Sequence, residues 1–145
     1  MQEAVLEEEH EAIVEVDKLN THQSIMKNNA YKIIALQENY AKISLDISHC
    51  ERVSENGLIY DGVVFSAATF VATAAINEKN MFLIGVDLDL LTPLKEEAGT
   101  IILEASSQQT SSGKKMVKVT GKINEVVFLE GSFSLLKLDE KSLIK

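Results

Sequence analysis

The chain has 145 residues, 46% of them hydrophobic, and a formal net charge of −8. A chain of this length is expected to form a single domain with a sizeable core. The charge is uneven, because residues 1–17 hold seven of the 22 acidic residues and no Lys or Arg, which leaves 15 acids against 14 bases in the rest. Without clustered positive charge, neither nucleic acid nor an anionic membrane surface is an expected partner.

The single cysteine, Cys50, excludes a disulfide within the chain. The first 14 residues are acidic where a secretory signal would be basic, and no apolar run is long enough to span a membrane, so a cytoplasmic location is expected. Three scattered histidines and one cysteine do not have the spacing of metal ligands, and no metal site is predicted.

The N-terminal 28 residues are expected to form a helical extension. Apolar residues recur at roughly helical spacing between residues 2 and 17, with acids on the other faces. This acidic helix is predicted to pack on the domain, on a second protomer or on a protein partner. A short second helix is predicted over residues 21–26, capped by Asn20 or Thr21.

Two strands are predicted next, over residues 30–37 and 40–48, with a tight turn at Glu38-Asn39. In the second strand, apolar and polar residues alternate strictly from Ala41 to Ser48. Residues 51–60 are largely polar and contain the turn signal Asn56-Gly57.

The stretch from Gly62 to Ile76 is the most informative part of the chain. It has no charge, no proline and no second glycine, and it contains five alanines among larger apolar residues. A helix that is apolar on every side is expected to be buried on every side. At about 15 residues it is too short for a membrane span, so a sheet must wrap around it.

Four more strands are predicted after this helix, over residues 82–91, 100–107, 117–123 and 126–138, with a turn at Asn124-Glu125 between the last two. Phe82, Ile84, Val86, Leu88 and Leu90 are expected to share one face of the first of them. Such alternation is typical of an antiparallel sheet with one wet face. The predicted class is therefore α+β, with a curved antiparallel sheet of five to six strands around a long buried central helix.

Three segments, in this order and spacing, resemble the hot-dog fold of acyl-CoA thioesterases and their relatives: NGLIYDGVVFSAATFVATAA, FLIGVDLDLLTPLKEEAGT with Pro93 and Gly99 in its loop, and GKKMVKVTGKINEVVFLEGSFSL with Gly131 in its last strand. The resemblance covers about Tyr31 to Leu138. It implies one domain over residues 1–145, with a hot-dog core over residues 30–138.

The resemblance also implies a homodimer, with pairing into tetramers left open, and an acyl-CoA or other fatty acyl thioester bound near the start of the central helix. No cofactor is implied besides that ligand. Backbone N–H groups at the helix start would polarise the thioester carbonyl. The candidate ligand-binding residues are Tyr60, Asp61, Gly62 and Thr69, with Lys114 and Lys115 as candidate contacts for the CoA phosphates. The alternatives are helix packing for Thr69 and a solvated hairpin turn for the two lysines.

The sequence departs from the family at its catalytic positions. Many such thioesterases carry His-Gly-Gly before the helix and an acid or Asn nine residues after the His. Here Tyr60 stands at the His position, Asp61 and Gly62 at the two glycines, and Thr69 at the acid. A threonine needs an activating base to act as a nucleophile, so the catalytic residues are unknown. Asp61 is the remaining candidate, and helix capping is its alternative role.

Three functions follow as hypotheses. The first is a protein that binds an acyl thioester with little or no hydrolysis and has a carrier or regulatory role. The second is an active acyl-CoA thioesterase that uses a non-standard set such as Asp61 with Tyr60. The third is an interaction module whose ligand tunnel is filled by side chains, with residues 1–17 contacting a protein partner.

Overall fold

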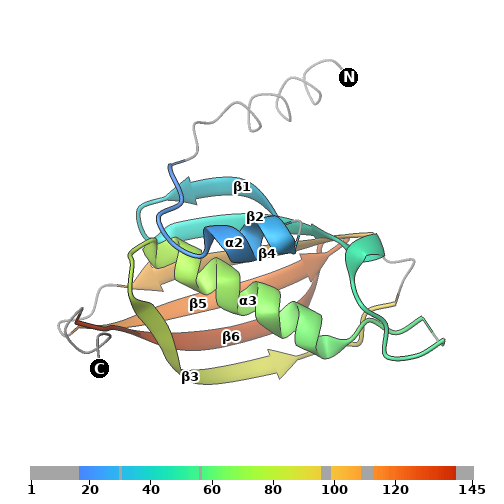
Figure 1. Ribbon diagram of the computed structural model, residues 1–145. Coiled ribbons are helices and arrows are strands. Elements are labelled where there is room, and N and C mark those ends of the chain that lie inside the picture. Colours follow the sequence, from blue (N-terminus) through green and yellow to red (C-terminus); the bar gives the residue numbers. More distant parts are fainter. Residues whose placement is uncertain (1–16, 30, 56, 96–98, 109–112, 140–145) are drawn as a thin grey trace, which may run out of the picture.

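The fold is a six-stranded antiparallel sheet with one long helix across its concave face (Figure 1). It is seen in a computed structural model that describes residues 17–29, 31–55, 57–95, 99–108 and 113–139. The elements are α2 (Gln23–Asn28), β1 (Lys32–Gln37), β2 (Tyr40–Asp46), the 3₁₀ turn η1 (Ile47–His49), α3 (Asp61–Ile76), β3 (Met81–Leu90), β4 (Thr100–Gln108), β5 (Lys114–Ile123) and β6 (Val126–Lys137). The predicted acidic helix over residues 2–17 falls almost entirely outside the described residues.

The strand order is β1-β2-β4-β5-β6-β3, and every neighbouring pair is antiparallel. Strands β4, β5 and β6 form a meander, while α3 carries the chain from β2 to β3 at the far edge. The predicted turn at Asn124-Glu125 is present, with φ of 51° and 67° at its two residues. Positive φ at both central residues is the geometry that suits a two-residue hairpin turn. The edge strands of the described sheet are therefore β1 and β3, and the Asp17 N–H donates to the Leu36 carbonyl of β1 at 3.0 Å.

The central helix is buried mainly in its second half. From Ala67 to Ile76 every residue except Thr69 is buried, whereas Asp61, Phe65 and Ser66 are exposed. The prediction that the whole helix is covered is therefore wrong for its first turns. The physical reason is its position, because α3 packs mainly on β4, β2 and β5 and less on β6 and β3.

Residues 17–29 and Tyr31 cover the C-terminal half of α3. The rings of Tyr31 and Phe70 pack with centroids 5.0 Å apart. Asn77 ends the helix in the left-handed conformation, and its amide donates to the Lys18 carbonyl at 2.8 Å. The Asn20 backbone N–H in turn donates to the Asn77 side chain at 2.6 Å. The described part of this segment is therefore attached to the C-terminal end of α3.

The helix α2 does not have the predicted cap. His22 is its N-cap, with φ of 56° and no side-chain capping bond. The Asn20 backbone is bonded to Asn77, and the Thr21 hydroxyl lies 2.6 Å from Nδ1 of His22, so neither predicted residue caps this helix. Burial of the His22 ring lowers its pKa.

Strand β3 contains a bulge that changes which residues share a face. The pairing with β6 shifts between Leu83 and Gly85, so Ile84 is an extra residue. Leu83 is opposite Leu135 and Val86 is opposite Phe133, and both partners are buried under the helix side of the sheet. The prediction that all even-numbered apolar residues of β3 share one face therefore fails at the bulge, and Leu83 replaces Phe82 on the concave side.

Candidate ligand site at the start of the central helix

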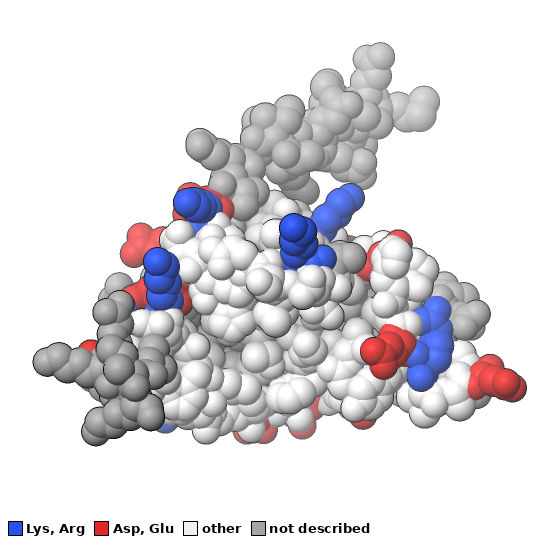
Figure 2. Space-filling view, viewed as in Figure 1, with Lys and Arg blue, Asp and Glu red and all other residues white. Residues whose placement is uncertain are grey.

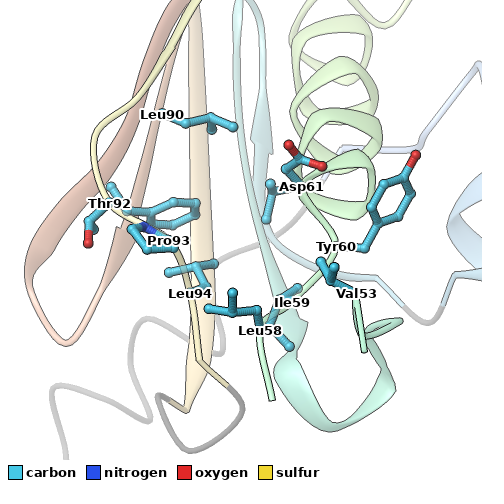
Figure 3. A pocket seen from close by; sticks show the side chains of 11 residues that line it. Val53, Leu58, Ile59, Tyr60, Asp61, Leu90, Thr92, Pro93 and Leu94 are labelled. Carbon is cyan, nitrogen blue, oxygen red and sulfur yellow. The ribbon is translucent and has the colours of Figure 1, made fainter. Parts of the chain in front are cut away.

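A cavity of ≈ 460 Å³ lies at the N-terminal end of α3 (Figure 3). Its volume is within the range of small-molecule sites, about 300–1,000 Å³. The lining combines the loop before α3, the start of α3, the loop after β3 and one buried ring of β6. The lining residues are Val53, Leu58, Ile59, Tyr60, Asp61, Val64, Leu90, Thr92, Pro93, Leu94 and Phe128.

Backbone hydrogen bonds hold the two loops that form the cavity walls. The loop before α3 folds back on itself, since the Tyr60 N–H donates to the Glu51 carbonyl at 2.9 Å. It is joined to the opposite wall by the Ile59 N–H, which donates to the Leu94 carbonyl at 2.9 Å. The Leu91 N–H donates to the Phe128 carbonyl at 2.8 Å. Both walls are therefore tied to the sheet or to each other.

The first turn of α3 presents unused hydrogen-bond donors. Tyr60 is the N-cap in an extended conformation and makes no side-chain capping bond. The Val63 N–H donates to the Tyr60 carbonyl at 3.0 Å, but the N–H groups of Asp61 and Gly62 have no acceptor within the described part of the chain. Together with the partial positive charge of a helix start, about half a unit, these donors suit a carbonyl oxygen.

The Asp61 carboxylate is the charged group of this cavity. The side chain is exposed and has no hydrogen bond or ion pair with any residue that the structure describes. In Figure 3 it lies between α3 and the strand that carries Leu90, while the Tyr60 ring extends on the other side of the helix. No Lys, Arg or His is among the described lining residues, so no positive side chain offsets it there.

Gly62 lies against the ring of Tyr60. A Cβ atom at this position would overlap that ring. Because the ring is 48% exposed, a larger residue at this position would turn it outward. Tyr60, Asp61 and Gly62, three of the predicted site residues, are therefore brought together at the cavity.

Thr69 is placed elsewhere. It follows Asp61 by eight residues, which is about 12 Å along the helix, and it does not line the cavity. Its hydroxyl donates to the Phe65 carbonyl at 3.0 Å, a bond within the helix. In this arrangement the hydroxyl satisfies a helix carbonyl.

Lys114 and Lys115 lie at the opposite end of β5 from the cavity. They pair with Leu136 and Leu135, whereas Gly121, near the cavity end, pairs with Leu129. Seven strand residues separate Lys114 from Gly121, or about 23 Å. Within one protomer these lysines are therefore not part of the site around Asp61.

The described lining has no pair of groups for nucleophilic catalysis. Such a pair needs a nucleophile within hydrogen-bond reach of a base, and the lining offers one carboxylate, one phenol and one threonine hydroxyl among apolar side chains. No cluster of three or more metal-ligating side chains occurs among the residues described. The arrangement can enclose an apolar chain and bond a carbonyl oxygen.

Most of the cavity lining was not predicted from the sequence. Leu58, Leu90, Leu94 and Phe128 come from separate segments that meet only in the fold. Pro93 was noted as a family feature of its loop, and it does line the cavity. The other positions carried no signal beyond being apolar.

An uncovered apolar face lies beside the cavity. Phe65, Val86 and Leu90 are 40%, 39% and 44% exposed, and the Phe65 ring stacks on Phe133 of β6 with centroids 6.3 Å apart. Figure 2 shows few charged side chains over α3 and the lower part of this face, where β6 and β3 lie in Figure 1.

No helix in the described segments has the length and hydropathy that crossing a membrane requires.

The chain is similar to one curated protein and to several solved structures, whereas no family model matches it. Methylthioribose-1-phosphate isomerase from Aquifex aeolicus is 30% identical over 115 residues, which are 79% of this chain and 25% of that protein. The chain thus spans a quarter of the length of the curated relative it matches, and nothing in that match assigns the isomerase activity to it.

The solved structures match over nearly their whole length. Cj0977, a sigma28-regulated virulence protein from Campylobacter jejuni, is 34% identical with a TM-score of 0.75, and the match covers 83% of this chain and 93% of that one. The uncharacterized protein PH1136 from Pyrococcus horikoshii is 26% identical with a TM-score of 0.78, over 87% and 96%.

The PaaI protein of the Escherichia coli phenylacetic acid degradation operon shares the fold alone, at 14% identity, with a TM-score of 0.69 over 81% of this chain and 86% of that one. With the observed strand order and central helix, these matches confirm the predicted fold. The chain belongs to the hot-dog fold, thioesterase-like superfamily.

Proposed function

We propose that this protein binds an acyl thioester, such as a fatty acyl-CoA, and hydrolyses it slowly or not at all. The observation that carries the proposal is the ≈ 460 Å³ cavity at the start of α3, whose described lining is apolar apart from Tyr60, Asp61 and Thr92. An apolar cavity with a few convergent polar groups is the usual form of a small-molecule site. A carrier or regulatory role follows from binding without turnover.

The proposed pose puts the acyl chain in the cavity and the thioester carbonyl at the helix start. Val64 and Phe128, 4% and 1% exposed, provide an apolar floor for the chain. The carbonyl oxygen accepts from the free N–H groups of Asp61 and Gly62. This arrangement uses the donors that lack an acceptor in the described structure.

Slow or absent hydrolysis is expected because the family's acid position is Thr69. The Thr69 hydroxyl bonds within the helix and lies outside the cavity lining. One observation favours the alternative of an active thioesterase: Asp61 has no partner in the described structure and lines the cavity, so it is available as a general base toward water. The third possibility, an interaction module with a filled tunnel, does not suit a cavity of this volume.

Self-association is part of the same proposal. The apolar face of Phe65, Val86 and Leu90 adjoins the free edge of β3, so a second copy would cover that face and extend the sheet. In such a dimer, Lys114 and Lys115 of the second protomer are the candidates for contacts with CoA phosphates. Pairing of dimers into tetramers, and a protein partner for residues 1–17, stay predictions.

Binding is tested by thermal melting and calorimetry with a series of acyl-CoAs from two to sixteen carbons. A ligand at one hundred times its dissociation constant stabilises the fold by about 2.7 kcal/mol. Leu58→Trp fills the cavity from a half-buried wall position and should abolish the shift. Ile25→Trp, on the exposed side of α2, is the matched control and should retain it. Absence of any shift in the wild type refutes the proposal.

Hydrolysis is measured in parallel as the release of free CoA thiol. The expected result is turnover no faster than the uncatalysed rate. Sustained turnover that is lost in Asp61→Asn and retained in Asp87→Asn would replace the binding proposal by the thioesterase alternative. Asp87 lies on the convex face of β3, opposite Ser132, and serves as a control for the change in charge.

A further inference from the structure

From the geometry of the cavity we infer that Asp61 selects against carboxylates, so that the site accepts an uncharged acyl ester and rejects the corresponding free fatty acid. The inference rests on the proposed function, because it concerns the ligands of the same cavity. It assigns Asp61 a role in specificity rather than in catalysis.

The electrostatic balance at the cavity is the first argument. The helix start contributes a positive charge of about half a unit, whereas the Asp61 side chain contributes a full negative charge in the first turn of the same helix. The net charge at the helix start is therefore negative. Had this position been uncharged, the helix start would have attracted a carboxylate.

No other described side chain of the lining corrects this balance. Apart from Asp61, the lining contains one phenol and one threonine hydroxyl, and the rest is apolar. Arg52, in the loop that forms one wall, points its guanidinium group at backbone carbonyls, since its Nη1 donates to the carbonyls of Ile47 and Cys50. Lys95 follows the lining residue Leu94, but it is exposed and does not line the cavity.

The position of the reacting end of the ligand is the second argument. An acyl group with its chain in the apolar cavity and its carbonyl at the Asp61 and Gly62 N–H groups has its head within a few ångströms of the Asp61 carboxylate. For a thioester this head is uncharged, and its oxygen accepts a hydrogen bond. For a free acid the head is an anion beside another anion.

The expected magnitude follows from Coulomb's law. Two unit charges about 6 Å apart, at an effective dielectric constant of about 40 for an exposed group at a cavity mouth, repel by an energy that corresponds to roughly a tenfold change in affinity. Added salt weakens this repulsion. The discrimination is therefore expected to shrink as the ionic strength rises.

The consequence for a carrier is that it does not retain the hydrolysed form of its ligand. A fatty acid released by a separate hydrolase would leave the site free for another thioester. For a thioesterase, the same feature would reduce inhibition by the acid product. The selectivity is therefore useful under either reading of the cavity.

The test uses a pair of ligands that differ only in charge, octanoate and methyl octanoate, titrated by calorimetry at pH 7.5. The quantity measured is the ratio of the dissociation constant of the acid to that of the ester. The ratio is expected to be about ten or more in the wild type at low salt, to approach one in Asp61→Asn, and to keep its wild-type value in Asp87→Asn. Raising the salt concentration should lower the wild-type ratio.

A wild-type ratio near one, or a ratio that Asp61→Asn leaves unchanged, overturns the inference. These outcomes differ from failure of the proposed function. If the wild type binds neither ligand and no acyl-CoA, but Asp61→Asn binds octanoate, the cavity is an acyl site closed to anions by Asp61, and the inference stands without the thioester proposal. If neither variant binds any of these ligands, both are refuted.

Discussion

Gly131 allows a close approach between β6 and the edge strand β3, and its replacement tests how that edge is attached. A Cβ atom on Gly131 would lie 2.8 Å from the Asp87 carbonyl oxygen, 3.2 Å from the Leu88 Cα and 2.7 Å from the Leu88 Cδ1. Two of these neighbours are backbone atoms, which no side-chain rotation can move. Gly131→Ala is therefore expected to push β3 away from β6.

The magnitude is best read against a second glycine. Overpacking of this kind is expected to lower the free energy of unfolding by about 2–3 kcal/mol, while the change from Gly to Ala in a strand offsets it by about 0.5–1 kcal/mol. Gly85 is in the interior of β3, and its added Cβ would meet only Ser134, at 3.8 Å. Gly85→Ala carries the same entropic gain without overpacking, so the difference between the two variants isolates the close contact.

The assay is thermal melting of both variants at one protein concentration. For 145 residues, an unfolding entropy of about 0.3 kcal/mol/K converts 2–3 kcal/mol into a Tm difference of about 7–10 °C. Gly85→Ala should melt at or slightly above the wild type. If the two variants melt within about 2 °C of each other, the close approach of β3 to Gly131 does not constrain the edge and the reasoning is refuted.

Three further predictions concern the core and two titrating groups. Phe128→Ala removes a ring that is 1% exposed and forms part of the cavity floor. The substitution should lower the free energy of unfolding, measured by urea titration, by about 3–5 kcal/mol. A loss below about 1 kcal/mol would contradict the packing around this ring. Burial raises the pKa of the Cys50 thiol; the nearby Arg52 guanidinium lowers this pKa in part, and the Asp46 carboxylate raises it further. A disulfide reagent at pH 8 should therefore modify Cys50 slowly in the native protein and at once in denaturant. Equal rates would show that the thiol is accessible. Burial lowers the pKa of the His22 imidazole in the folded protein, so the unfolded chain takes up a proton on His22 at a higher pH. The contribution of His22 to stability is therefore present above about pH 6.5 and is lost as the pH falls below that value. His22→Asn, which keeps a residue suited to the left-handed conformation, should reduce the loss of stability between pH 7 and pH 5; an unchanged pH profile would contradict the assignment.

The parts of the fold that repeat a simple pattern could be predicted from the sequence. Alternation from Ala41 to Asp46 and the uncharged run from Gly62 to Ile76 lead directly to β2 and α3, because each element buries one regular set of side chains. The turn at Asn124-Glu125 was also predicted. These local patterns, with their order along the chain, were enough to indicate the family.

The errors arise where tertiary contacts override a local pattern. Gly85, a glycine inside a predicted strand, signals a bulge in the sequence, but the residue at which the pairing shifts depends on the register with β6. The exposure of Phe65 depends on where α3 lies on the sheet, and composition alone does not determine that position. The cap of α2 was missed because the Asn20 backbone bonds instead to Asn77, which is 57 residues away.

The candidate site was predicted in part. Tyr60, Asp61 and Gly62 precede or begin an uncharged helix, which made them visible as the helix start. Thr69 lies nine residues after Tyr60, the spacing of the family's acid, but it is not among the residues that line the cavity, and its hydroxyl bonds to the Phe65 carbonyl. The apolar wall residues come from loops whose meeting depends on long-range pairing, and their types are common throughout the core.

The strand order has a consequence for synthesis of the protein on the ribosome. The sheet partner of β3 is β6, which ends 47 residues after Leu90. At translation rates of about 5–20 residues per second, the nascent chain holds an unpaired apolar strand and an incompletely covered alanine-rich helix for roughly 2–10 s. Chaperone capture and aggregation are therefore expected to act mainly on incomplete chains, and a stop codon before Val126 should yield insoluble product.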